Sequence, residues 1–223
     1  MKKTTILLGM VFCLLLAGCA SSQTGENPAL SDDTPSVTVE EGRTIMPLPD
    51  TTMDNLTDAI LSISLEEGKA YVDDNGRMQM DLTIYSYDQY DMVDIAGLKV
   101  GDTLVRHDGE VVVVSIERSE TGRIAINGGL EKDGFDLVTD DSGTFYEMGY
   151  NDAKNWYPVG DATIRVSADF QGTDRADPEL GEVILYPGDF LIGAVTNYDF
   201  TPYNTTIRVE NGQIIEMTRS YIP

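Results

Sequence analysis

Apolar and polar residues alternate with a period of two along several parts of the chain. Residues 78–85 and residues 162–170 show this alternation most clearly, while Val111–Val114 is an uninterrupted run of β-branched residues. Alternation predicts strands with one buried face, and a continuous β-branched run predicts a strand covered on both faces.

Turn-forming residues separate these stretches. Asp108-Gly109, residues 120–122, residues 140–143 and Asn211-Gly212 each stand between two predicted strands. Only residues 52–61 fit a short helix, and a strand fits the end of that stretch at least as well. The sequence therefore predicts an all-β fold, an antiparallel sandwich or barrel of about ten strands with at most one short helix.

The last hairpin allows a prediction of register. A three-residue loop over 210–212 places Ile207 opposite Ile215 and gathers four apolar side chains on one face, whereas a two-residue loop in a regular ladder mixes apolar and charged residues. Burial therefore favours the three-residue loop, with positive φ at Gly212. Tyr221 is expected to hold the C-terminus to the core.

The first nineteen residues have the composition of an export signal. A basic start is followed by an apolar stretch over residues 6–16, which is too short to span a bilayer. Leu16-Ala17-Gly18-Cys19 comes next. This order resembles the lipobox of bacterial lipoproteins.

The resemblance implies a lipid anchor. Residues 1–18 would be a signal peptide, removed before Cys19, and Cys19 would carry a diacylglyceryl group and, at its new amino terminus, a fatty acid such as palmitate. The protein would then sit on the extracytoplasmic face of the cell membrane or of an outer membrane, because two or three acyl chains hold a protein firmly. The rest of the chain resembles only uncharacterised bacterial lipoproteins, so no activity comes with the resemblance.

A polar segment follows the expected anchor. Residues 19–45 are rich in Ser, Thr, Pro, Gly and acidic residues without an apolar period, which predicts a flexible linker. A coil of this length reaches ~25–30 Å. Residues 46–223 are expected to form the β domain, either undivided or as two subdomains separated near 128–134.

Composition limits the chemistry. The chain has 38 acidic against 15 basic residues, for a net charge of −23, which argues against nucleic acid as a partner. His107 is the only His and lies at the tip of a predicted hairpin, where we expect it to be solvated. A zinc site or a Ser-His-Asp triad would need this residue, so the sequence predicts no catalytic residue of that kind, no metal and no cofactor.

Two acidic clusters deserve comparison with calcium loops, which use oxygen ligands. Neither has the spacing of a calcium loop, and both are expected to be solvated. The clusters are Asp133, Asp136, Asp140 and Asp141, and Asp169, Asp174 and Asp177.

One aromatic segment is the candidate ligand-binding site. Planar rings beside amide and carboxylate groups suit sugars, although a large aromatic ring can equally pack a loop onto the core. The candidate residues are Trp156, Tyr157, Asn151 and Asp152.

These observations favour a function without catalysis. The sequence predicts a lipid-anchored binding, adhesion or envelope-assembly module whose partners are membrane lipid, through Cys19, and a glycan or an envelope protein. The alternative is a glycan-active enzyme that uses two carboxylates at a separation of about 5–10 Å.

Overall fold

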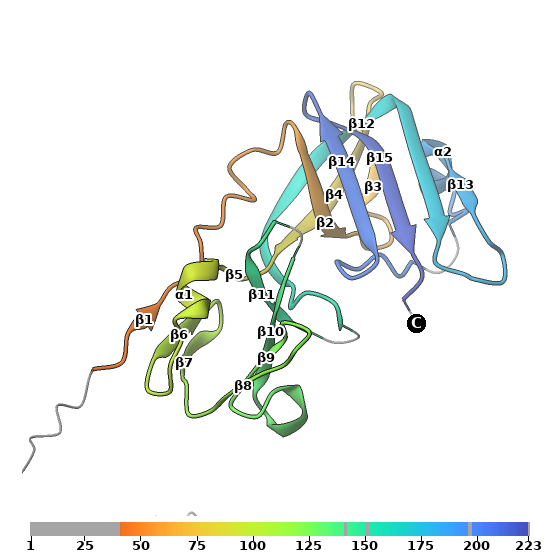
Figure 1. Cartoon of the computed structure of the whole chain (residues 1–223). Helices are drawn as coiled ribbons and strands as arrows, with labels where there is room; N and C mark the ends of the chain where they lie inside the picture. The colour runs from red at the N-terminus through yellow and green to blue at the C-terminus, as the bar shows by residue number, and fades with distance from the viewer. Residues whose placement is uncertain (1–40, 141, 150–151, 196–197, 223) are drawn as a thin grey trace, which may run out of the picture. The chain divides into compact units, whose positions relative to one another are not determined.

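The computed structural model describes residues 41–140, 142–149, 152–195 and 198–222 (Figure 1). The expected signal peptide, Cys19 and most of the linker lie outside this part of the chain, as does Asn151. The described residues form fifteen strands, two short α-helices and one 3-10 helix, which confirms the all-β prediction. The strands are β1 (Thr44–Ile45), β2 (Ala59–Ser64), β3 (Ala70–Val72), β4 (Met78–Ser86), β5 (Gln89–Tyr90), β6 (Thr103–Arg106), β7 (Gly109–Val112), β8 (Ile116–Arg118), β9 (Ile124–Ile126), β10 (Phe135–Thr139), β11 (Phe145–Met148), β12 (Tyr157–Arg175), β13 (Val183–Leu185), β14 (Thr205–Glu210) and β15 (Gln213–Ser220).

Five strands close into a partial barrel. The first half of β12 pairs antiparallel with β4, and its second half pairs parallel with β15. β15 pairs with β14, β14 with β2, and β2 with β4, which completes the ring. β3 and β13 are added at its margins. We call these seven strands the barrel region.

The barrel encloses the larger apolar core. Met80, Leu82 and Ile84 of β4 are buried, as the alternation predicts, and so are Ile164 and Val166 of β12. Their polar neighbours on both strands point outward. This alternation therefore divides each strand into an inner apolar face and an outer polar face.

The chain between β4 and β12 builds a second region. A three-stranded sheet has the order β1-β6-β7, and a five-stranded sheet has the order β5-β11-β10-β9-β8. They share a separate cluster of buried apolar residues that includes Tyr90, Leu104 and Leu137. We call residues 88–155, with β1, the inserted region.

The two cores do not divide at residues 128–134. Ile126 and Phe135, on either side of that stretch, both lie in the core of the inserted region. The chain instead leaves the barrel after Ser86 and returns to it at Tyr157, which pair with each other across β4 and β12. Residues 44–45, expected in the linker, form β1 beside β6, and Ile45 is buried.

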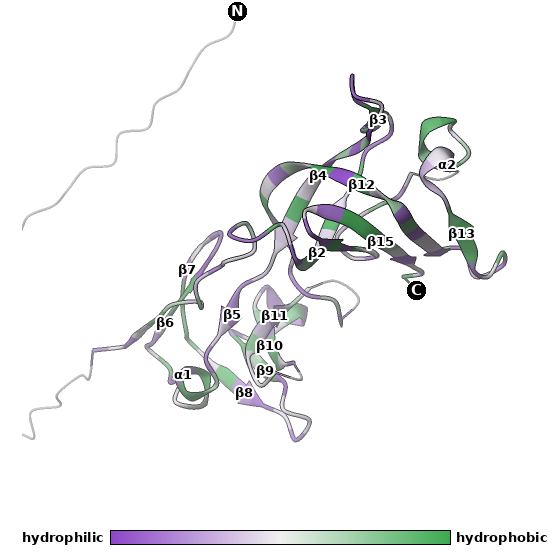
Figure 2. Cartoon of the chain, turned by 90° about the horizontal axis from the view of Figure 1, so that it is seen from above, coloured by the Kyte–Doolittle hydropathy of each residue, from purple (hydrophilic) through white to green (hydrophobic). Residues whose placement is uncertain are grey.

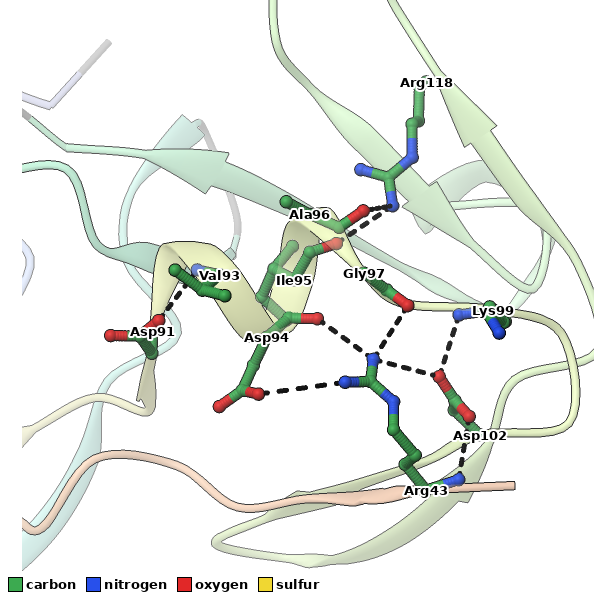
Figure 3. A network of polar contacts seen from close by, with 10 residues as sticks. All are labelled: Arg43, Asp91, Val93, Asp94, Ile95, Ala96, Gly97, Lys99, Asp102 and Arg118. Atoms are coloured by element: carbon green, nitrogen blue, oxygen red, sulfur yellow. Dashed lines mark hydrogen bonds and ion pairs between the residues drawn. The ribbon is translucent and has the colours of Figure 1, made fainter. Parts of the chain in front are cut away.

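Polar contacts hold the start of the described chain to the inserted region (Figure 3). Arg43 donates from its backbone N to Asp102 Oδ1 at 2.8 Å and from Nη2 to the carbonyl of Gly97 at 2.7 Å. Arg118 Nη2 donates to the carbonyl of Ile95 at 2.9 Å. Both cations thus lie at the C-terminal end of helix α1 (Met92–Ala96), where the helix dipole favours positive charge, and the carbonyl of Ile95 also accepts from the Leu98 backbone N at 3.2 Å.

The structure has two α-helices where the sequence predicts at most one. Asp91 caps α1 by accepting from the Val93 backbone N at 2.7 Å, and α2 (Pro187–Leu191) begins at a proline. A helix of five residues is too short for a 3.6-residue period to show in the sequence. Residues 52–61 are not helical, because turns lead there directly into β2.

The predicted register of the last hairpin is wrong. The loop has two residues, Asn211 and Gly212, with φ of 50° and 70°. A shift in register between Arg208 and Val209 then places Ile207 opposite Met217 instead of Ile215. The positive φ at Gly212 is confirmed, but Tyr221 is 53% exposed and does not hold the C-terminus to the core.

The valine run also differs from expectation. Val113 is buried, whereas Val112 and Val114 are 56% and 66% exposed. Only one face of this stretch is covered, so the run alternates in burial like a strand with one buried face.

Candidate functional site

A groove lies on the outer face of the barrel. It has a volume of about 400 Å³ and lies where the chain passes from β2 to β3, beside β4 and β12. Hydroxyl and charged side chains dominate its lining. The lining residues are Ser64, Glu66, Lys69, Asp81, Leu82, Thr83, Asp161, Ala162 and Thr163.

Two reciprocal Asp–Thr pairs form one wall of the groove. In the antiparallel register of β4 and β12, Asp81 lies opposite Thr163 and Thr83 lies opposite Asp161. Thr163 Oγ1 donates to Asp81 Oδ1 at 2.7 Å, and Thr83 Oγ1 donates to Asp161 Oδ1 at 2.8 Å. Tyr71 OH donates to Asp81 Oδ1 at 3.2 Å. The four side chains are thus held in place by one another.

This arrangement leaves acceptors for a ligand. Both aspartates use Oδ1 for their protein contacts, and no donor in the described part of the chain reaches either Oδ2. An ionised carboxylate only accepts hydrogen bonds, while hydroxyl groups both donate and accept. Lys69 adds a cation to the lining. The groove therefore suits a ligand that carries several hydroxyl or amine groups.

His107 belongs to a second polar cluster, and the prediction that it is solvated holds only in part: the residue as a whole is exposed, whereas its ring is partly covered. It does lie at the tip of the β6–β7 hairpin, but its side chain is only 24% exposed. Its backbone N and its Nδ1 each lie 2.8 Å from Asp88 Oδ2, and its ring stacks on Tyr157 with centroids 4.0 Å apart. The cluster joins the inserted region to the first residue of β12.

The packing of Tyr157 against His107 and Asp88 changes the pKa of its phenol. Burial raises the pKa of its phenol to about 12, and the negative charges of Asp88 and Asp50 add to the effect. No side-chain hydroxyl or thiol among the described residues hydrogen-bonds to His107. Among the described residues, the Asp88–His107 pair is thus engaged in packing and has no serine, threonine or cysteine as a hydrogen-bonding neighbour.

Among the described candidate residues for ligand binding, Trp156 and Tyr157 contact different neighbours. Trp156 packs edge-on against Tyr87 with centroids 5.0 Å apart, and Lys154 Nζ lies 3.8 Å from the centre of the Tyr87 ring. Tyr157, although adjacent in sequence, contacts His107 instead. Asp152 is exposed with a φ of 59°, and Asn151 lies outside the described residues. The indole of Trp156 packs against the ring of Tyr87 and lies near the ammonium group of Lys154.

Several acidic residues expected in solvated loops are partners of arginine. Asp136 is fully buried and pairs with Arg123, while Asp174 pairs with Arg219. Asp140 accepts hydrogen bonds within its own turn, and the hydroxyl of Ser142 is the largest cause of its lowered pKa. Within the described ranges, no group of three or more His, Cys, Asp or Glu residues is arranged to hold a metal ion.

Buried Glu147 is also paired with an arginine. Burial raises the pKa of its carboxyl, and the nearby charge of Arg106 opposes that rise. Arg106 Nε lies 2.9 Å from Glu147 Oε2, and Asn155 Nδ2 donates to Oε1 at 2.9 Å. This buried acid is therefore committed to contacts inside the protein.

Sequence reasoning missed the groove, although a signal was present. Asp81, Thr83 and Thr163 occupy polar positions in the two clearest alternating stretches, and Asp161 directly precedes the second stretch. Their outward direction could be predicted, but the pairing of β4 with β12 could not.

Comparison of the chain with protein-family models, with curated proteins and with solved structures finds no match. Of the helices in the described part, none is long and apolar enough to cross a bilayer. The assignment of function therefore rests on the sequence and on the geometry above.

Proposed function

We propose that this protein is a lipid-anchored, extracytoplasmic binding module that holds a glycan in the groove on the outer face of the barrel. The observation that carries the proposal is the pair of reciprocal Asp–Thr contacts, which fix two carboxylates with unused acceptor atoms at one wall of a cavity. Sugars offer dense hydroxyl groups, which such carboxylates recognise. The lipobox supports the location and the tether.

The exposure of the groove favours binding over catalysis. Asp81 and Asp161 are diagonal neighbours on β4 and β12, so the groove does bring two carboxylates close to one another. A general acid, however, is normally kept protonated by burial. Asp161 is exposed, so the groove does not bury this candidate acid.

A glycan array tests the binding proposal. The probe is the chain from residue 20 onward, which lacks the expected lipid-attachment Cys and keeps every described residue. We expect selective binding that Asp81→Asn and Asp161→Asn each weaken at least tenfold. Asp169→Asn is the matched control, because Asp169 is also exposed on β12 but does not line the groove.

Two results would contradict the proposal. One is the absence of binding to any glycan, and the other is equal binding by the groove variants and the control. Release of reducing ends from a bound glycan, lost in Asp161→Asn, would instead favour the enzymatic alternative.

Anchoring is tested separately. Cys19→Ala in the full-length chain should leave uncleaved precursor or protein released from the membrane fraction. Normal processing and membrane retention of this variant would refute the lipid anchor while leaving the groove unaffected.

A further inference from the structure

Residues 180–192 expose an unusual density of apolar side chains. Six large apolar residues lie on the surface in this one segment, and β13 stands out as hydrophobic in Figure 2. Exposed apolar clusters on soluble proteins mark interaction sites more often than chance. The six, with their exposed fractions, are Leu180 (70%), Val183 (40%), Ile184 (47%), Tyr186 (62%), Leu191 (41%) and Ile192 (78%).

β13 is also an edge strand. Its three residues pair with residues 172–174 of β12, and within the described ranges no strand lies on its other side (Figure 1). An edge of this kind presents unpaired backbone N–H and C=O groups to which another chain can add. Lysine and proline, which commonly protect such edges, are absent from Val183–Leu185.

A small cavity lies beside the edge. It has a volume of about 170 Å³ and is lined mainly by Leu180, Val183, Leu185 and Val195, with the Asp174–Arg219 ion pair also in its wall. A strand added to an edge places alternate side chains on each face, and recognition by strand addition relies on pockets for those side chains. The cavity is thus placed to take an apolar side chain from an added strand.

Charge indicates which segment can occupy the edge. Asp177, Glu179, Glu182 and Asp189 flank β13 in the sequence, and Arg175 is already paired with Glu182 at 2.6 Å. A second copy of this chain would bring like charges together, which costs free energy. Residues 4–42 contain acidic residues but no Lys or Arg, so this part of the chain is equally unsuited. An anionic membrane surface would also be repelled.

We propose that β13 is a docking edge for an extended segment of a partner protein in which apolar residues alternate with Lys or Arg. The segment adds to the free edge of β13 by backbone hydrogen bonds, inserts an apolar side chain into the adjacent cavity and places its cations beside the acidic rim. This inference is independent of the groove, which lies where the first half of β12 pairs with β4 and uses none of these residues.

Two synthetic peptides test the proposal by calorimetry on the chain from residue 20 onward. One has the sequence Lys-Val-Arg-Ile-Lys-Val, and the other replaces each cation by Glu. We expect the basic peptide to bind at least tenfold more tightly, with affinity falling as salt rises. Hydrogen exchange should slow at the amides of residues 183–185 when it binds.

Variants locate the contact. Ile184→Lys should weaken binding of the basic peptide at least tenfold, because it removes apolar surface and adds a repelling charge at the edge. Ile60→Lys is the matched control, since Ile60 is 75% exposed on β2, which is paired on both sides. Asp161→Asn should leave peptide binding unchanged, which separates this test from that of the groove.

The proposal is overturned if the two peptides bind equally or if Ile184→Lys binds like the unaltered chain. Self-association in gel filtration, or binding to anionic vesicles, that is lost in Ile184→Lys would assign the edge to a second copy or to a membrane instead.

Discussion

Removal of the Asp102 carboxylate should detach the start of the folded chain. The Asp102 side chain is only 4% exposed and accepts backbone hydrogen bonds from Arg43 N and Lys99 N, each at 2.8 Å. Arg43 Nη2 approaches its Oδ2 at 3.5 Å (Figure 3). In a tethered protein, any pull on the anchor enters the fold at this point. We therefore expect Asp102→Ala to weaken the attachment of β1.

The magnitude follows from the contacts. A hydrogen bond to a charged group contributes about 1.5–3 kcal/mol, and there are two such backbone donors at Asp102. The contact with Arg43 adds less than about 1 kcal/mol, because the Arg43 side chain is 48% exposed. Water can reach the freed amides in part, so we expect a loss of about 3–4 kcal/mol in the free energy of unfolding.

Urea denaturation measures this loss, with Asp94→Ala as the control. Asp94 faces the same Arg43 at 4.0 Å but is 51% exposed, so its removal should cost less than about 1 kcal/mol. A loss below about 1 kcal/mol for Asp102→Ala, or equal losses for both variants, would refute this account of the contacts.

The pH dependence gives a second check. Burial alone would raise the pKa of Asp102, but the N–H groups of Arg43 and Lys99 and the charge of Arg43 outweigh it, so the pKa is lowered. A group whose pKa is lower in the folded state stabilises the fold above its unfolded pKa and loses that contribution as pH falls. The difference between wild type and Asp102→Ala should therefore shrink below about pH 4.

Three further variants test other contacts. Arg123→Ala leaves the fully buried Asp136 without its cation and should cost about 1–3 kcal/mol by urea denaturation, because Arg123 itself is 43% exposed, whereas an unchanged midpoint would show that the pair contributes nothing. Gly212→Ala should cost about 1–2 kcal/mol through its left-handed backbone alone, because no atom lies within 4 Å of the added Cβ; a neutral result would contradict the observed turn. The pKa of Tyr157, about 12, lies above its unfolded value of about 10, so its contribution to stability is lost as pH rises through this range. Tyr157→Phe should reduce that alkaline loss relative to exposed Tyr221→Phe, and identical pH profiles would show that Tyr157 does not contribute.

Local pattern predicted the strands and their faces. The alternation in β4 and in the first half of β12 identified which side chains lie inside, because one apolar face must be buried for either strand to be stable. The groove could not be predicted in the same way. Its Asp–Thr contacts join residues 78 and 82 positions apart, and strand pairing at that distance depends on the closure of the whole barrel.

His107 also shows that a local pattern cannot predict contacts between residues far apart in the sequence. Its place at a hairpin tip was evident from Asp108-Gly109, and hairpin tips are usually solvated. What covers its ring is Tyr157, fifty positions away, at the point where the chain re-enters the barrel. A local pattern describes which residues form a turn but carries no information on what the turn packs against.

The C-terminal hairpin shows how two valid local rules can yield a wrong register. Asn-Gly favours a two-residue loop, and burial requires Ile207, Val209 and Met217 on one face. A regular ladder cannot satisfy both, which is why a three-residue loop was predicted. The chain satisfies both by leaving Ile215 unpaired, so that Ile214, fully buried, takes the inward position.

That irregularity coincides with the closure of the barrel. The partner of β15 on its other side, β12, shifts register at the same level, between Val166 and Gln171. Bulges bend a strand and increase its twist, and a sheet that curls back on itself needs such bends at its corners. Ile215, which breaks the period-two pattern in β15, thus lets both β12 and β14 keep their pairing with β15. Closure of the sheet, which no single hairpin encodes, therefore decides which isoleucine faces the core.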